Sequence, residues 1–304
     1  MSFAYGTPTN QQNIGTTIRA SSTSNFLISS KDREGYNVFP GGDPANFNIN
    51  KKSNILNGFF TRLALNEIVI DYCLKNISTY WNNTKFAVDI GSPAVEYVYT
   101  VPEGHYTVAQ VLDTIVSGLN ALASPNVFNL YSNPDGTKAL VCSNGGAIAF
   151  KVKAITNAGV VVDQLPNDLN ILSIGTYNTY YNISCPKLLG TEFLDFVCPQ
   201  ITNNQALKDS STALTEQNII FRWYLASNTA ELTDTYGYPI FQGYKPFIQR
   251  REIAFPKQIA WVPNQPIGQL TFQIYDDKGR LMNLSLAGGL GELEYNMTML
   301  VTEN

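Results

Sequence analysis

Short runs of alternating apolar and polar residues follow one another along most of the chain after residue 54. This period of two is typical of β-strands with one buried face. The first run, residues 55–72, is long, and its alternation shifts once near Leu63, which predicts a strand with a bulge or kink. A turn and a strand are expected over 76–90, with a tight turn at Asn82-Asn83. Further strands are expected at 95–101, 126–132, 138–143, 147–155, 192–201, 218–226, 246–255, 269–286 and 294–303.

The stretch VPEGHYTVAQVLDTIVSGLN, residues 101–120, departs from this pattern. Its apolar residues recur at helical spacing over 108–119 and form one stripe along a helix of about four turns. Thr107 is a suitable N-cap, and Gln110 three residues later completes a capping box. A Pro-Glu-Gly turn precedes the helix, and the sequence from Gly118 onwards predicts its end.

Residues 1–50 differ from the rest of the chain because they are rich in Gly, Ser, Thr, Asn and Pro and contain few spaced apolar residues. Such a segment cannot bury a core by itself, so we interpret residues 1–50 as an extended N-terminal arm. A frayed terminus is the alternative. The apolar pairs Phe26–Leu27 and Val38–Phe39 favour an arm that docks on another surface.

The order of these elements predicts a mainly β protein, an all-β sandwich with a small α+β insertion around residues 93–182. The insertion carries the one amphipathic helix and an antiparallel meander with an Asn-Pro-Asp-Gly turn at 133–136. A short helix is also expected near 167–171. The chain of 304 residues has the length of one large domain or two.

Charge is scarce along the whole chain. Only 14% of the residues are charged and the net charge is −4, whereas about a quarter is usual. Asn, Thr, Ser, Gln and Tyr supply the polarity instead, which suits both a β-rich fold and a surface covered by neighbouring molecules. The densest basic cluster, Arg250–Arg251 flanked by Lys245 and Lys257, is too small to predict a nucleic-acid site.

The sequence also gives no sign of a membrane span or a signal peptide, because no run of about 18 apolar residues is present. The cysteines form no C-x-x-C pair, and we expect them to be reduced and buried, as in a chain that folds in the cytosol. They are Cys73, Cys142, Cys185 and Cys198. The tripeptide Asn76-Ile77-Ser78 matches the glycosylation pattern, which we attribute to the abundance of Asn.

Few residues could combine for catalysis or metal binding. His105 is the single histidine, and no G-x-S-x-G elbow accompanies it, so we expect no catalytic role for it. The carboxylate pairs Glu192 with Asp195 and Asp276 with Asp277 could serve glycoside hydrolysis, but such pairs are common at strand ends. One histidine and scattered cysteines do not supply a zinc site. We therefore predict no enzyme and no catalytic, cofactor-binding or metal-binding residues.

Aromatic residues are the remaining signal, with 17 Tyr, 16 Phe and 3 Trp. They gather in the run YGYPIFQGYKPF, residues 236–247, where Pro and Gly predict loops. Large amphipathic rings in a loop are good anchors for another protein. A long loop packed on its own sandwich is an equally good interpretation.

Three segments in order resemble one protein family. Residues 53–86, the strand, turn and helix at 99–120, and the strands at 270–303 with their Asp-x-x-Gly hairpin are similar to parts of the penton proteins. These are the single jelly-roll minor capsid proteins of virophages and polinton-type elements, and the similarity is greatest to those of Mavirus-like virophages. The resemblance spans about residues 52–303 and leaves the arm uncovered.

The resemblance implies a jelly roll formed by residues 51–92 and 183–304, with an insertion at 93–182 that projects outward. It also implies homopentamers at icosahedral capsid vertices, in contact with the surrounding major capsid protein, in a virion whose proteins are made and folded in host cytoplasm. The family has no catalytic motif. The insertion is a candidate for receptor contact, and the arm for ties to neighbouring subunits.

A host-attachment spike or carbohydrate-binding β-sandwich is the alternative function. It would require a concave site lined by aromatic residues and measurable binding to a glycan. An enzyme would instead show a deep polar pocket that holds coupled carboxylates or His105.

Two substitutions in the 101–120 stretch separate a structural role from a chemical one. We expect His105→Ala to leave particle assembly intact, because the residue lies in a turn. Leu112→Asp should unfold the insertion, because it places a charge in the apolar stripe of the helix. Electron microscopy of particles and circular dichroism of the purified protein measure the two effects, and the reverse pair of outcomes would assign chemistry to the loop.

Overall fold

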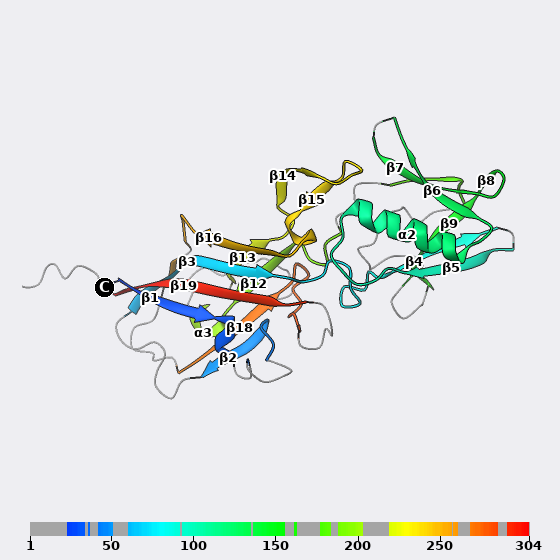
Figure 1. Cartoon of the computed structure of the whole chain (residues 1–304). Helices are drawn as coiled ribbons and strands as arrows, with labels where there is room; N and C mark the ends of the chain where they lie inside the picture. Colours follow the sequence, from blue (N-terminus) through cyan, green and yellow to red (C-terminus); the bar gives the residue numbers. More distant parts are fainter. Residues whose placement is uncertain are drawn as a thin grey trace, which may run out of the picture.

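The computed structural model of the protein describes residues 23–33, 36, 42–50, 60–91, 93–134, 136–155, 161–162, 177–183, 188–202, 219–256, 258–260, 268–284 and 291–303. In this part of the chain the protein is mainly β, as the sequence predicts. Figure 1 shows two parts placed end to end: a sandwich of strands, and a smaller unit that carries the long helix.

Eight strands form the sandwich in the order of a jelly roll. They are β1 (Thr23–Ser29), β2 (Asn46–Asn50), β3 (Phe60–Tyr72), β12 (Phe193–Val197), β13 (Ile219–Tyr224), β16 (Phe247–Glu252), β18 (Gln269–Tyr275) and β19 (Leu293–Glu303). One sheet has the order β1-β19-β3-β16, and the other has the order β13-β12-β18-β2. Counted along the chain, the first, eighth, third and sixth strands therefore face the second, seventh, fourth and fifth, so that β16 lies opposite β13.

The alternating residues of these strands fill one core between the two sheets. In β19, for example, Leu293, Tyr295 and Met297 are buried, while the residues between them point outward. The long strand β3 contains the predicted bulge at Asn66: Glu67 pairs with Thr298, but Leu65 already pairs with the next residue, Met299. A second register shift, between Phe60 and Arg62, lies on the other side of Leu63. A short strand, β17 (Gln258–Ala260), pairs with β3 beyond the bulge.

The prediction of an extended arm over residues 1–50 is wrong for two segments. β1 pairs with β19 along its whole length, and β2 pairs with β18. Ile28, Phe47 and Ile49 point into the core, and Phe26 packs against it. A few apolar residues suffice here because the neighbouring strands supply the rest of the core. The pair Val38–Phe39 lies outside the described residues.

The second part is the predicted insertion, and it contains two small sheets and a helix. Its elements are β4 (Lys85–Ile90), β5 (Val95–Thr100), α2 (Val108–Leu122), β6 (Val127–Ser132), β7 (Lys138–Ser143), β8 (Ala147–Ile148), β9 (Phe150–Ile155), β10 (Val161–Val162) and β11 (Tyr180–Asn182). The sheets have the orders β10-β9-β4-β5 and β11-β7-β6, and β8 pairs with β7. β4 thus belongs to the insertion, although the sequence interpretation assigned residues up to 92 to the jelly roll.

Helix α2 begins as predicted and ends later. The Thr107 hydroxyl accepts from the Gln110 amide, and the Gln110 side chain accepts from the Thr107 amide, so the capping box is complete. Gly118 does not end the helix; it lets the helix approach β5, since a Cβ there would lie 2.1 Å from the ring of Tyr99. Asn120 uses its side chain to hold the backbone of Phe128 on β6. The helix expected near 167–171 lies outside the described residues.

The aromatic run at 236–247 packs inside the molecule, but against the insertion. Between β13 and β16 the chain forms β14 (Asn228–Thr233), β15 (Pro239–Phe241) and the 3-10 turn η2 (Gln242–Tyr244). Tyr238, Ile240 and Tyr244 are buried in the core of the insertion, beside Leu188 and Leu189. The core of the insertion is therefore completed by residues of the jelly roll.

The last two strands are not partners of each other, in contrast to the expected closing hairpin. β18 and β19 lie in opposite sheets. The Asp-x-x-Gly turn itself is present: the Asp276 carboxylate accepts from the amides of Lys278 and Arg280, and Gly279 has a φ of 72°. The bridge between Tyr275 and Leu281 and the hydrogen bond from the Met282 amide to the Ile274 carbonyl continue it as a short hairpin. The short helix α3 (Pro199–Thr202) follows β12.

Gly190 lies where the chain returns from the insertion to the jelly roll, and a substitution there tests how tightly the side chains pack around it. A Cβ at Gly190 would lie 2.0 Å from the buried indole of Trp81, whose Nε1 donates to the Lys75 carbonyl. We expect Gly190→Ala to lower the free energy of unfolding by about 1–3 kcal/mol, as overpacking does. Gly146→Ala is the matched control, because nothing lies within 4 Å of the added Cβ. Urea unfolding of both variants checks this, and equal stability would show that the indole can move aside.

Candidate functional site

The two parts meet in a neck of residues 73–84, 101–106 and 188–190, where the chain leaves the jelly roll and returns to it. Asn76 is buried at its centre. Its amide nitrogen donates to the carbonyls of Tyr106 (2.9 Å) and Leu188 (3.0 Å), and its oxygen accepts from the Tyr106 amide (2.9 Å). The Asn76 side chain therefore connects the segment that leaves the jelly roll after β3 to two others. These are the segment that leads into α2, at Tyr106, and the segment that returns to the jelly roll, at Leu188. This burial also leaves no room for a glycan on Asn76.

A second buried amide supports the first. Asn83 donates to the carbonyl of Asn76 and accepts from the amide of Ser78, so it closes the turn at residues 76–83. Asn82, the neighbouring turn residue, has a positive φ of 59°. Asn adopts this conformation more readily than most residues. The Asn-Asn turn expected from the sequence is thus present, and it positions Asn76.

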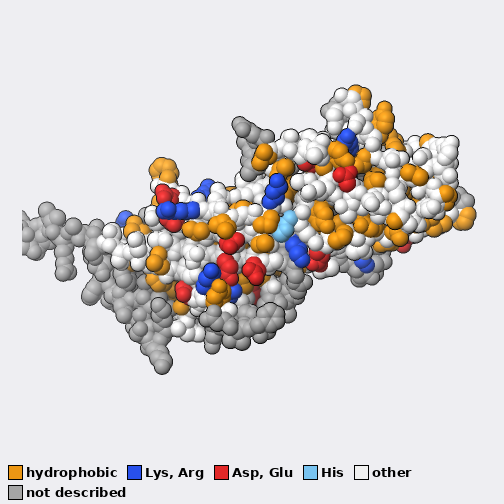
Figure 2. Space-filling model, viewed as in Figure 1, with side chains coloured by type: hydrophobic (Ala, Val, Ile, Leu, Met, Phe, Trp, Pro, Cys, Tyr) orange, Lys and Arg blue, Asp and Glu red, His pale blue; other side chains and the backbone are white. Residues whose placement is uncertain are grey.

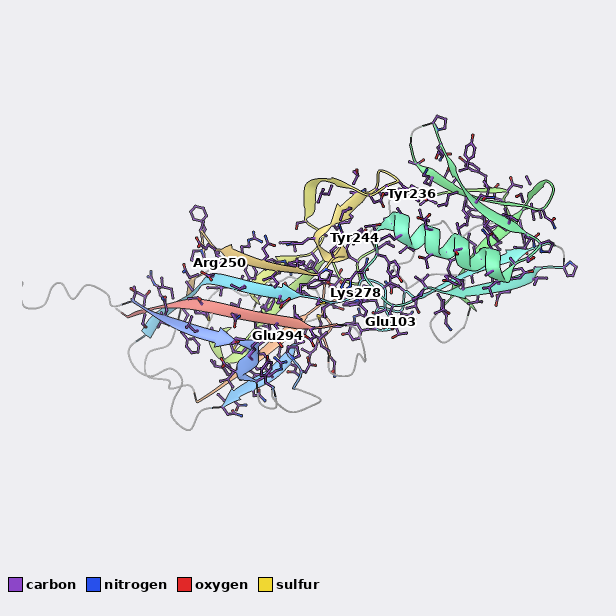
Figure 3. The ribbon with its side chains drawn as sticks, viewed as in Figure 1. Glu103, Tyr236, Tyr244, Arg250, Lys278 and Glu294 are labelled. Atoms are coloured by element: carbon purple, nitrogen blue, oxygen red, sulfur yellow. The ribbon has the colours of Figure 1, made fainter. Side chains whose placement is uncertain are left out.

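At the surface of the neck, Glu103 links the turn to the chain that enters the helix (Figure 3). Its carboxylate accepts from the amide and hydroxyl of Thr79 and lies 3.6 Å from the ammonium of Lys75. Burial alone would raise the pKa of Glu103, but the hydrogen bonds from Thr79 and the charge of Lys75 outweigh it and lower that pKa.

His105 lies in the same neck, and Figure 2 shows it at the surface between the two parts. Burial lowers its pKa, opposed by hydrogen bonding to the backbone of Leu74 and Cys73. Its Nε2 is buried without a hydrogen-bond partner. Within the described part of the chain no carboxylate or hydroxyl group is hydrogen-bonded to this nitrogen, so the described residues do not assemble a Ser–His–Asp triad around His105.

The loop that contains β14 and β15 makes the third tie between the two parts. Asp234 accepts from the Ala109 amide (2.8 Å) at the start of α2, and its other oxygen accepts from the amides of Tyr236 and Tyr238. A carboxylate is favourable at this end of a helix. Tyr236 donates to Asp113 (2.6 Å), and this hydrogen bond, with burial, raises the pKa of Tyr236 to about 12. Figure 3 shows Tyr236 and Tyr244 beside the start of the helix.

The carboxylate pairs proposed from the sequence do not form an acid–base pair. Asp195 binds the guanidinium of Arg222 with both oxygens, at 2.6 and 2.7 Å. Glu192, by contrast, is exposed. Asp276 holds its own turn and Arg280, and Asp277 accepts from the Glu192 amide. Each pair is thus divided between separate structural contacts.

The basic cluster and the cysteines are likewise dispersed. Arg250 is ion-paired with Glu67 and Glu252, whereas Arg251 points toward the other sheet. Cys142 and Cys198 are buried and Cys73 is half-buried, and burial raises the pKa of the Cys198 thiol to about 12. Cys185 and Lys257 lie outside the described residues.

Within the described ranges no three His, Cys, Asp or Glu side chains converge as a metal site. None of the helices there is long and apolar enough to cross a membrane.

The exposed apolar residues of the jelly roll lie on its outer strands. Within the described chain, β1 pairs only with β19 and β16 only with β3, so each has one free edge. Leu27 on β1 is 71% exposed, Ile248 on β16 is 74% exposed, and Phe255 just after β16 is 96% exposed. Figure 2 shows hydrophobic and uncharged polar side chains over much of the surface. Exposed apolar groups of this size indicate interaction surfaces.

A pocket of about 410 Å³ opens beside one of these edges, between β13 and β16. It is lined by Trp223, Tyr224, Ala226, Ser227, Gln242, Gln249 and Arg251. A second, apolar hollow of about 590 Å³ lies in the insertion, lined by Gly91, Ala94, Ile148, Ala149 and Tyr177. The described residues that line the two pockets include no carboxylate and not His105.

No protein-family model and no curated protein matches the sequence. Among solved structures, the chain is similar to the crystal structure of the selenomethionine-labelled mavirus penton protein, with 11% identity and a TM-score of 0.46, covering 94% of this chain and 100% of that one. It is also similar to a chain in the cryo-EM structure of the Sputnik virophage, with 12% identity and a TM-score of 0.41, covering 92% and 97%. Identity and TM-score are both low, so no function or assembly is transferred from either structure.

Sequence patterns did not reveal the residues that join the two parts. Asn76 and Asp234 are polar residues in turn-rich segments, and only their partners, far away in the chain, distinguish them. One available signal for Asn76 was its position between the apolar residues Leu74 and Ile77, where a polar side chain must be exposed or fully hydrogen-bonded.

We expect Asn76→Ala to loosen the neck without unfolding the jelly roll. It leaves the buried Tyr106 amide and two carbonyls without their partner, at a cost of about 2–4 kcal/mol. Hydrogen exchange at the Tyr106 amide should therefore become faster, and proteolysis should cut first between the two parts. Asn129→Ala on the exposed face of β6 is the matched control. Unchanged exchange at Tyr106 would contradict the role given to Asn76.

Proposed function

We propose that the protein is a structural subunit of a virus capsid, a penton that forms homopentamers at the icosahedral vertices and contacts the surrounding major capsid protein. The observation that carries this proposal is a jelly roll whose two opposite outer strands, β1 and β16, both have a free edge and an exposed large apolar side chain. The resemblance of residues 52–303 to penton proteins supports the same assignment.

The β16 edge has the character of a buried interface. All its residues after Phe247 are exposed, and they include Ile248, with Phe255 following at the end of the strand. A protein that remains alone in solution normally protects such an edge with a short strand, proline or charge. Here the outward charges are Arg250 and Glu252, which pair with each other, and Arg250 also binds Glu67.

The opposite edge, β1, carries no charge at all in the segment TSNFLIS. Leu27 points outward from it, and the free backbone groups of the strand remain available for pairing. The sequence of β1 therefore lacks the devices that prevent contact with another chain.

Two different sheet edges with exposed apolar residues, on opposite sides of one subunit, favour a head-to-tail arrangement in which unlike edges meet. When each subunit places its β16 side against the β1 side of the next, the contacts close a ring if the rotation between subunits fits. The low content of charged residues, 14%, agrees with extensive contacts to neighbours. The neck holds the insertion at the end of the sandwich, so the insertion would project from such a ring and be free for receptor contact.

Substitutions at the β16 edge test the proposal. Because Ile248 and Phe255 are exposed, Ile248→Lys and Phe255→Asp should leave the unfolding free energy of the subunit within about 0.5 kcal/mol. They should, however, abolish pentamers, because each buries a charge in the contact between subunits. Native mass spectrometry measures the pentamer, and image reconstruction of particles measures the vertex density.

The matched control is Leu122→Lys, which changes an apolar residue that is 49% exposed at the end of α2, in the insertion. This variant should assemble normally. Full vertex density with both edge variants would reject the assignment of β16 to a subunit contact. Particles with three-fold or no symmetry at the position of this protein would reject the penton itself.

A further inference from the structure

The pocket between β13 and β16 lies where the two sheets of the jelly roll separate at their edge. Its inner end is closed by aromatic packing: Phe247 stacks on Tyr72 and on Trp223, with ring centroids 5.0 and 6.2 Å apart. Trp223 is buried and Tyr224 is half exposed. The pocket is therefore a concave site with an aromatic rim, open to solvent.

Polar side chains enter this pocket from β16. The strand alternates, so Gln249 and Arg251 face the same way as Phe247, toward the other sheet, and line the pocket. Gln242 contacts Gln249 and accepts a hydrogen bond from the Ser227 hydroxyl at 3.2 Å. These amides and the hydroxyl keep further donor and acceptor capacity for a ligand.

Among the described residues that line the pocket, Arg251 alone is charged. Its guanidinium lies 5.8 Å from the ring of Phe221, and within the described part of the chain it has no ion pair. Arg250 next to it, in contrast, points outward and binds Glu67 at 2.6 Å. A positive group at a pocket wall without a carboxylate favours an anionic ligand.

We infer that this pocket binds an acidic sugar, a pyranose ring that carries a carboxylate. The Arg251 guanidinium has the fork geometry that binds a carboxylate with two parallel hydrogen bonds. Gln242, Gln249 and Ser227 can bind ring hydroxyls, and the exposed ring of Tyr224 offers an apolar face to the sugar. A volume of about 410 Å³ is suited to a ligand of one or two rings.

Every residue of the pocket belongs to one subunit, but the pocket opens beside the β16 edge that the proposed pentamer would cover. Binding is therefore measured on the Ile248→Lys variant as well, which stays monomeric under the proposed function. The experiment uses the purified full-length chain and two probes, 3′-sialyllactose and the neutral lactose. Saturation-transfer NMR and isothermal titration should detect binding of 3′-sialyllactose, with its carboxyl-bearing ring in closest contact with the protein, and at least about tenfold weaker binding of lactose.

Variants then locate the site. Arg251→Ala should weaken binding of 3′-sialyllactose at least about tenfold, and Arg251→Lys should restore only part of it, because an ammonium lacks the fork. Gln249→Leu gives a second probe of the same wall. Arg250→Ala is the matched control and should bind normally, since its side chain points away from the pocket. Thermal unfolding confirms that each variant is folded.

Four results would overturn the inference. They are absence of binding by the unmodified protein, equal binding of lactose, unchanged binding by Arg251→Ala and Gln249→Leu, and an equal loss in Arg250→Ala. An acidic peptide that competes for the pocket more tightly than 3′-sialyllactose would also overturn it and assign the pocket to a partner protein. Pentamer formation is measured separately, so the two proposals can fail independently.

Discussion

The buried amide of Asn76 is the interaction on which the arrangement of the two parts depends. The insertion interrupts the jelly roll between β3 and β12, so the chain must cross the same place twice. Asn76 lies on the segment that leaves the jelly roll, and its side chain hydrogen-bonds Tyr106, just before α2, and Leu188, on the segment that returns. A buried amide tolerates only an arrangement in which its donors and acceptor are satisfied, so it selects one geometry for the neck.

The same geometry explains why the insertion has no complete core of its own. Its helix and sheets leave an apolar side that is covered by Tyr238, Ile240 and Tyr244, which come from the connection between β13 and β16. Asp234 on that connection also accepts from the start of α2. The insertion is therefore held by packing and by hydrogen bonds at separate points, and it is set on the jelly roll as a rigid projection.

The strand order makes the outer edges of the sandwich its chemically distinctive surface. The centre of each sheet is shielded by neighbouring strands, whereas β1 and β16 end their sheet with exposed apolar residues. A sandwich also separates at its edges, and there β16 directs Gln249 and Arg251 into the gap beside Tyr224. Apolar contact surfaces and a polar pocket thus arise from the same constraint, which is that an open sandwich has edges.

The sequence by itself determined the local elements: the capped helix α2, the bulged strand β3, the hairpin turns and most strands after residue 54. These follow from periods of two or 3.6 residues and from turn chemistry, which depend on near neighbours only. Tertiary structure decided which sheet each strand joined, the recruitment of β1 and β2 from the N-terminal region, and the burial of the 236–247 run. Those outcomes depend on partners far away in the chain, and a polar strand such as Asn46–Asn50 becomes a strand because β18 offers its edge.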